Sequence, residues 1–275
     1  ELAAGFPASP SARQALEQLP PQEGPEELDA RARVLAAHGR APEAIELWER
    51  FGLQHAGHPL ANQAQYQTAA AYADLKQYER AGARYRLLFA VSRLPEALFA
   101  QADVAMQQGG YAAAIQVCEH FAREFPTHPL ADDALWQAAR TAERRGDRRQ
   151  AEGLYRRLAA SYPDSSLGEE AGWTAGFFAY GRGDYGPALA QFAGLAQRAR
   201  QVHVVDQSLF WAGKAAGLLG QPEQAREWFA RAALGFPRSY YAARAVALGY
   251  GSGALTATGP LLRAGPPAPA PPTPG

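Results

Sequence analysis

The sequence contains very few sulfur-containing residues. Only one of its 275 residues is cysteine, Cys118, and only one is methionine, Met106. A single cysteine excludes an internal disulfide, so cysteine usage indicates no cellular compartment. No apolar run approaches the roughly 20 residues of a membrane-spanning helix, so we predict no transmembrane segment.

An excess of charge of either sign is also missing. The 27 lysines and arginines balance 27 aspartates and glutamates, which leaves a formal net charge of zero. Because a nucleic-acid-binding protein needs a basic excess to neutralise phosphates, nucleic acid is not an expected partner.

Motifs for catalysis are absent as well. The sequence has no His-x₃-His spacing for zinc, no Gly-x-Ser-x-Gly elbow and no Gly-rich phosphate loop. We expect Cys118 to be a buried, inert thiol. Three pairs of adjacent carboxylates lie at predicted helix starts, where the helix dipole favours negative charge: Glu26/Glu27, Asp132/Asp133 and Glu169/Glu170. We predict no catalytic site, metal or cofactor in this chain, and leave open whether a longer parent protein is an enzyme.

An internal repeat organises the chain. Six alanines recur at intervals of 37, 33, 37, 37 and 37 residues: Ala44, Ala81, Ala114, Ala151, Ala188 and Ala225. Five residues before these alanines a glycine occurs in five of six repeats, and repeat two has Lys76 there. Four residues after them, five of six repeats have an aromatic residue, and repeat three has Cys118. Such columns predict paired helices, with the glycine ending the first helix and the alanine allowing close packing.

The first helix of each predicted pair has its own pattern. A small residue lies twelve positions before the key alanine, and an aromatic residue fifteen before it, except in repeat one, which has Asp29. The aromatic column consists of Tyr66, Phe99, Trp136, Trp173 and Phe210. We expect helix pairs at 26–38 and 42–55, 59–74 and 79–91, 95–108 and 111–124, 129–145 and 148–161, 167–181 and 186–200, and 204–219 and 222–235.

The two ends differ from this region. Residues 1–25 are rich in proline, with a short helix expected near 11–19 from an N-cap at Ser11, and a last helix is expected near 239–248. Residues 26–250 form the predicted solenoid. Residues 251–275 are rich in Gly, Pro and Ala and are expected to be a disordered tail or a linker to a further segment. The chain begins at Glu1, so we expect a processed or excised form, compatible with a signal peptide removed earlier.

These columns resemble the tetratricopeptide family over roughly residues 28 to 250. The resemblance implies an all-α, right-handed superhelical solenoid of about six helix pairs, with no sheet. Such a solenoid implies a protein or peptide segment as partner.

A narrower resemblance concerns the C-terminal repeat. The stretch from Phe210 to Ala215, followed by the run Pro237-Arg238-Ser239-Tyr240-Tyr241, is similar to the superhelical domain of soluble lytic murein transglycosylases. Lys214 stands where that family usually has Arg. The resemblance implies a periplasmic or cell-envelope location and peptidoglycan strands as a further partner. No Glu-Ser pair of that family's catalytic domain is present, so it implies the non-catalytic scaffold of such an enzyme.

A weaker resemblance keeps an alternative open. Phe125-Pro126 and Tyr162-Pro163-Asp164-Ser165, each followed by a helix containing Ala and Trp, are similar to periplasmic and outer-membrane assembly proteins with these repeats. On this interpretation the chain is a free-standing periplasmic adaptor that binds a protein segment.

Two surfaces are candidate binding sites. The five aromatic residues could line a groove that stacks on sugars or grips an extended peptide, or could fill the packing between repeats. Seven arginines crowd repeat four, as an anionic contact or as a solvated surface paired with Glu143 and Glu152: Arg140, Arg144, Arg145, Arg148, Arg149, Arg156 and Arg157.

Overall fold

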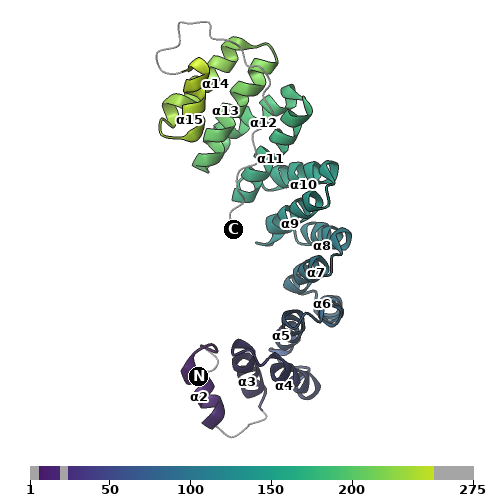
Figure 1. Cartoon of the computed structure of the whole chain (residues 1–275). Helices are drawn as coiled ribbons and strands as arrows, with labels where there is room; N and C mark the ends of the chain where they lie inside the picture. Colours follow the sequence, from purple (N-terminus) through teal and green to yellow (C-terminus); the bar gives the residue numbers. More distant parts are fainter. Residues whose placement is uncertain (1–5, 19–23, 251–275) are drawn as a thin grey trace. The chain divides into compact units, whose positions relative to one another are not determined.

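A computed structural model describes residues 6–18 and 24–250, and every regular element in these ranges is a helix. Helices α2 to α15 follow one another along the chain (Figure 1). Their bounds are α2 Pro10–Gln18, α3 Pro25–Ala37, α4 Ala41–Gln54, α5 Ala61–Asp74, α6 Tyr78–Ser92, α7 Pro95–Gln107, α8 Tyr111–Glu124, α9 Ala131–Arg144, α10 Arg148–Ser161, α11 Ser166–Arg182, α12 Tyr185–Arg198, α13 Val202–Leu218, α14 Pro222–Gly235 and α15 Tyr240–Ala245. A π-helical turn, Val246–Tyr250, follows α15. The six predicted helix pairs and the all-α fold are confirmed, and the predicted tail 251–275 lies outside the described residues.

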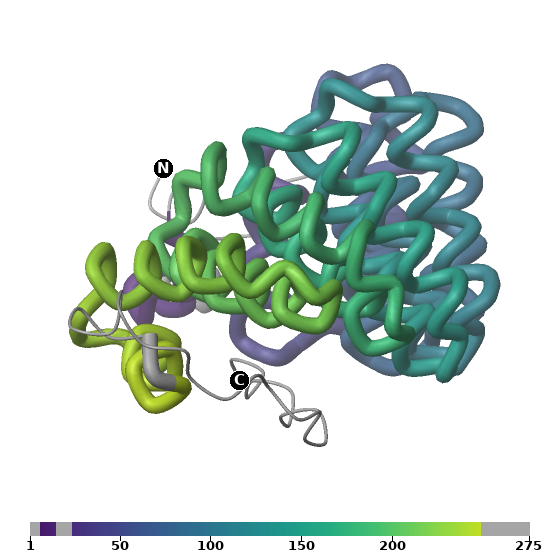
Figure 2. Tube along the Cα trace, turned by 90° about the horizontal axis from the view of Figure 1, so that it is seen from above, coloured from purple at the N-terminus to yellow at the C-terminus, as the bar shows by residue number. Residues whose placement is uncertain are grey.

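The chain divides into two compact units, with a boundary inside α9 between Ala134 and Leu135. In unit 1, residues 1–134, each helix from α3 to α8 packs against its neighbours in sequence. In unit 2, residues 135–275, helices α10 to α14 do the same and lie side by side (Figure 2), and α15 packs on α13 and α14. Each unit therefore builds its core from successive helix pairs.

The turn inside each pair explains the glycine column. Its five glycines all have a positive φ, between 72° and 89°, in the left-handed region that side chains disfavour. Lys76, the exception in repeat two, adopts the same conformation with φ 59°. The turn geometry is thus common to all six repeats, and glycine is its lowest-energy solution.

Close packing explains the small residues. The six key alanines are at most 1% exposed. At Gly213 on α13 a Cβ would lie 2.9 Å from Cε1 of Phe229, the aromatic residue of the same repeat, and at Gly176 on α11 it would lie 2.9 Å from Cε1 of Phe192. Each small residue therefore admits the ring of the partner helix.

The helix starts differ in how their N-cap positions are satisfied. Asp147 accepts a 3.0 Å hydrogen bond from the Gln150 backbone N–H at the start of α10. Asp184 holds the corresponding N-cap position before α12, but its side chain makes no cap bond there, because its carboxylate instead accepts a 2.8 Å hydrogen bond from Nε of Arg182. The N-cap expected at Ser11 is wrong, since the cap bond is formed two residues earlier, where Ser9 Oγ accepts a 3.1 Å hydrogen bond from the Ala12 backbone N–H.

Candidate functional site

The aromatic column lies at the interface between the two helices of a pair. Ring centroids are 5.2 Å apart for Tyr66 and Tyr85, 5.4 Å for Trp136 and Tyr155, and 5.5 Å for Phe210 and Phe229. In each case the partner is the aromatic residue four positions after the key alanine.

Burial differs along this column. Trp173 is 7% exposed and Phe210 is 5% exposed, whereas Tyr66, Phe99 and Trp136 are half-buried. Trp173 also stacks on Phe177, with centroids 5.3 Å apart. At Trp173 and Phe210 these contacts favour the packing alternative over a ligand-binding groove.

The arginines of repeat four all lie in unit 2, from the end of α9 to the third turn of α10. Arg140 pairs with Glu143 at 3.4 Å, and Arg156 pairs with Glu152. Four arginines are exposed and form no ion pair within residues 6–18 and 24–250: Arg144, Arg145, Arg148 and Arg149. We call these four the basic patch.

The carboxylate beside this patch is already neutralised. Glu152 is buried and contacts two guanidinium groups, those of Arg156 and Arg182. Arg182 in turn contacts Asp184 at 2.8 Å. Because Glu152 and Asp184 are already paired with Arg156 and Arg182, Glu152 has little negative charge left to screen the arginines of the basic patch.

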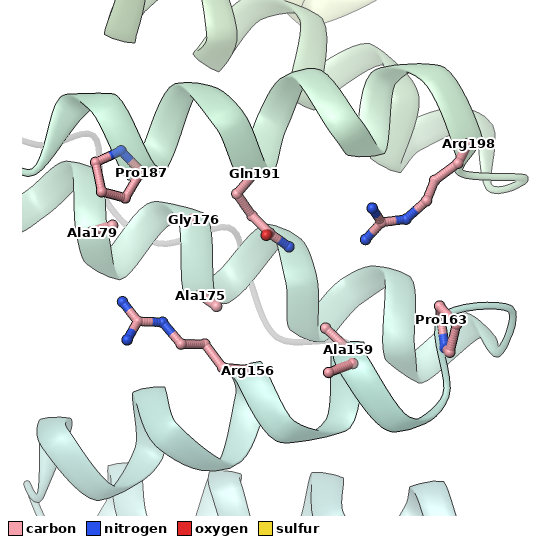
Figure 3. Close-up of a pocket in the computed structure, with 10 residues that line it drawn as sticks. Arg156, Ala159, Pro163, Ala175, Gly176, Ala179, Pro187, Gln191 and Arg198 are labelled. Atoms are coloured by element: carbon pink, nitrogen blue, oxygen red, sulfur yellow. The ribbon is translucent and has the colours of Figure 1, made fainter.

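A cleft of about 550 Å³ opens between α10 and α12, with α11 as its floor. Figure 3 shows Arg156 reaching over it from α10 and Arg198 from α12, near opposite ends, with Gln191 between them. The floor and walls carry small or apolar residues, Ala159, Ala160, Ala175, Gly176, Ala179 and two prolines. The cleft combines an apolar floor with cationic ends.

Missing side chains create this cleft. A Cβ at Gly172 would lie 2.8 Å from Nε2 of Gln191, and one at Gly176 would lie 3.2 Å from its Cγ, so glycine lets Gln191 lie against α11. Ala159 follows its key alanine by eight residues, the position that Phe89 holds in repeat two. Phe89, whose ring packs on Phe125 with centroids 6.2 Å apart, is the exception at this position, because the other repeats also have Gly or Ala there. Ala159 lines the cleft together with Gly176 of the next helix.

Sequence patterns did not identify Arg198 or Gln191. Arg198 is exposed at the last residue of α12 and, among the described residues, forms no ion pair. Neither Arg198 nor Gln191 belongs to an unusual motif. The only available sequence signal was the combination of Ala159 on α10 with the glycines of α11, which together leave room for a cleft.

The carboxylate pairs have structural contacts. Glu26 and Glu27 lie in the first turn of α3, and Asp132 and Asp133 in that of α9, as predicted; of the third pair only Glu169 lies in the first turn of α11, and Glu170 follows it. Glu169 is 3% exposed and accepts hydrogen bonds from the backbone N–H groups of Arg200 at 2.7 Å and Gln201 at 3.0 Å. It thus holds the loop before α13. Burial raises the pKa of Asp133, and its neighbour Asp132 raises it further.

Over residues 6–18 and 24–250 no three His, Cys, Asp or Glu side chains are grouped so as to hold a metal ion. None of the helices in these ranges is long and apolar enough to cross a bilayer.

These features define an all-α repeat scaffold whose described units are stacks of tetratricopeptide-like helix pairs. Residues 133–165, most of α9 and all of α10, match the tetratricopeptide repeat family. The matched segment contains the basic patch and one wall of the cleft. No curated protein matches the sequence significantly.

Several solved structures are similar in fold. PilW, a widely conserved type IV pilus biogenesis factor, is 18% identical, and the match covers 81% of this chain and 98% of PilW with a TM-score of 0.41. PilF of Pseudomonas aeruginosa is 15% identical over 81% of this chain and 96% of its own, with a TM-score of 0.44. A tetratricopeptide repeat protein from Parabacteroides merdae is 16% identical over 86% and 90%, with a TM-score of 0.45.

Proposed function

We propose that the chain is a non-catalytic scaffold of the cell envelope that binds an acidic segment of a partner protein through unit 2. The observation that carries this proposal is the basic patch, whose four exposed arginines form no ion pair in the described ranges. Guanidinium groups bind carboxylates with paired, geometrically specific hydrogen bonds. Four such groups near one helix turn favour a partner rich in Asp and Glu.

The zero net charge of the chain favours recognition at a local site over long-range electrostatic attraction by the whole molecule. The whole chain has zero net charge, so attraction at long range is weak and recognition depends on the patch itself. The envelope location rests on the resemblance of residues 210–241 to the transglycosylase scaffold.

The test is an array of short synthetic peptides that vary in charge and apolar content, probed with the purified chain. We expect retention of acidic peptides, and loss of that retention in the triple variant Arg144→Glu, Arg148→Glu, Arg149→Glu. Retention that ignores peptide charge, or that persists in the triple variant, would overturn the proposal. Sedimentation with purified peptidoglycan sacculi tests whether glycan strands are bound as well.

A second candidate is the superhelical part of a lytic transglycosylase. The observation that favours it is that the two stretches carrying the resemblance pack together. The rings of Phe210 and Tyr241 are 5.5 Å apart, and Ser239 Oγ donates a 2.9 Å hydrogen bond to Oδ1 of Asp206. Residues of α13 and α15 thus form one structural unit at the end of the stack.

Extending the reading frame separates the two candidates. A continuation past Gly275 into a domain with a Glu-Ser pair favours the transglycosylase scaffold, whereas a stop codon there favours the free-standing adaptor. In either case, we expect the purified 275-residue chain not to clear a peptidoglycan gel. Clearing that disappears when a single Glu is replaced would contradict a non-catalytic role.

A further inference from the structure

From the proposed function, on which this step rests, we infer that the cleft between α10 and α12 is the site that takes the acidic segment in extended form. Arg156 and Arg198 bind its carboxylates from opposite sides, and Gln191 hydrogen-bonds to its backbone amide groups. The basic patch guides the segment toward the cleft along α10.

Charge identifies the occupant as acidic. The residues that line the cleft include two guanidinium groups, those of Arg156 and Arg198, and no carboxylate, so the cleft lining carries an excess positive charge. Arg198 forms no ion pair in the described part of the chain, and is exposed at the cleft end. An added carboxylate would therefore find an unused donor there without displacing an internal partner.

Shape identifies the occupant as an extended chain with small side chains. A volume of about 550 Å³ falls within the range of about 300–1,000 Å³ usual for ligand sites. The Ala and Gly floor accepts small apolar side chains, and Gln191 offers both a donor and an acceptor to a peptide group.

The cleft and the basic patch lie along the same helix, α10, which favours an extended ligand over a compact anion. Arg149 and Arg156 are seven residues apart on α10, which places them on the same face of that helix, roughly 10 Å apart along its axis. A ligand that contacts both must extend out of the cleft along α10.

The lining also distinguishes peptide from nucleic acid. Single-stranded nucleic acid is usually held by aromatic side chains on which bases stack. The residues that line this cleft include no aromatic side chain. A peptide is therefore the occupant that both the charge and the lining favour.

The test uses the full chain and a fluorescent peptide of alternating Glu and Ala, followed by fluorescence anisotropy. Arg198→Glu should weaken binding by about tenfold or more, because it replaces a binding cation by a repelling anion. Ala160→Trp, which fills the cleft from the exposed side of α10, should weaken it similarly. Arg238→Glu is the control with the same charge change on an exposed arginine outside the cleft, and should leave affinity within about twofold.

The outcomes distinguish a failure of the cleft as the binding site from a failure of the proposed function. If the basic-patch triple variant loses the peptide while Arg198→Glu and Ala160→Trp bind it normally, the cleft is overturned and the proposed function stands. If the wild-type chain does not bind the acidic peptide, both are overturned. If an oligouridylate probe binds with the same dependence on Arg198, the cleft is a nucleic-acid site and the inference is wrong. Circular dichroism of each variant checks that it is folded.

Discussion

Trp48 and Asp29 form a polar version of a contact that is aromatic in other repeats. Nε1 of Trp48 donates a 3.1 Å hydrogen bond to Oδ1 of Asp29, and both side chains are buried. The two positions correspond to Tyr66 and Tyr85 in repeat two, whose rings are 5.2 Å apart. Asp29 therefore keeps the contact between the paired helices where the aromatic column is interrupted.

This contact predicts a coupled loss of stability. Asp29→Ala should lower the free energy of unfolding by about 1–3 kcal/mol, because the Trp48 N–H loses its acceptor inside the core. Arg33 also loses the carboxylate it contacts. A double-mutant cycle with Trp48→Phe, measured by urea unfolding, should give a coupling of about 0.5–3 kcal/mol between the two positions. Additive effects would show that the hydrogen bond contributes nothing.

The strained turn of repeat two predicts a stabilising substitution. Lys76 has φ 59° where five other repeats have glycine, and a side chain in this region costs about 1 kcal/mol or more. Lys76→Gly should therefore raise the free energy of unfolding by about 1 kcal/mol. Lys76→Ala removes the same charge but keeps a Cβ, so thermal unfolding should show no comparable gain. Equal effects of the two changes would point to charge instead of backbone strain.

The close contact between Gly213 and Phe229 in repeat six predicts that one added methyl group has a large effect on stability. In Gly213→Ala the new Cβ would lie within 3.0 Å of three Phe229 ring atoms, so overpacking should cost about 1–3 kcal/mol. Gly153→Ala is the matched control in α10, because no atom lies within 4 Å of its added Cβ. There alanine should stabilise by up to about 1 kcal/mol through helix propensity. If Gly213→Ala melts like the wild type, the two helices tolerate separation.

The sequence was most informative where a position has the same environment in every repeat. The glycine turns and the key alanines recur because each repeat forms the same turn and the same close contact, so their columns predicted the helices to within a few residues. Contacts that occur in only one repeat produce no recurring column in the sequence, so the sequence did not predict them. Asp184 binds Arg182 and not its own helix start, and the cleft depends on Ala159 lying beside glycines of the next helix. Such distances follow from packing, which a periodic pattern does not specify.

Burial predicts a difference between two tryptophans of the aromatic column. Trp173→Ala should lower the free energy of unfolding by about 3–5 kcal/mol, since the indole is 7% exposed and stacks on Phe177. Trp136 is half-buried, so Trp136→Ala should cost less. Urea unfolding gives both values, and peptide binding is measured in parallel. A folded Trp173→Ala variant that has lost binding would favour the groove for this column.

The thiol of Cys118 provides a reporter of how tightly repeat three stays closed. Burial, and secondly the nearby charge of Asp103, raise the pKa of Cys118 to about 12. The thiolate is the reactive form, so at pH 8 the folded chain should react with iodoacetamide about 10³-fold more slowly than the urea-unfolded chain. Because the folded pKa is the higher one, the folded rate should keep rising between about pH 10 and 12, where the unfolded rate has reached its plateau. A folded rate close to the unfolded rate at pH 8 would mean that α8 separates from α7 often enough to expose the thiol, and that the packing of repeat three is looser than its burial indicates.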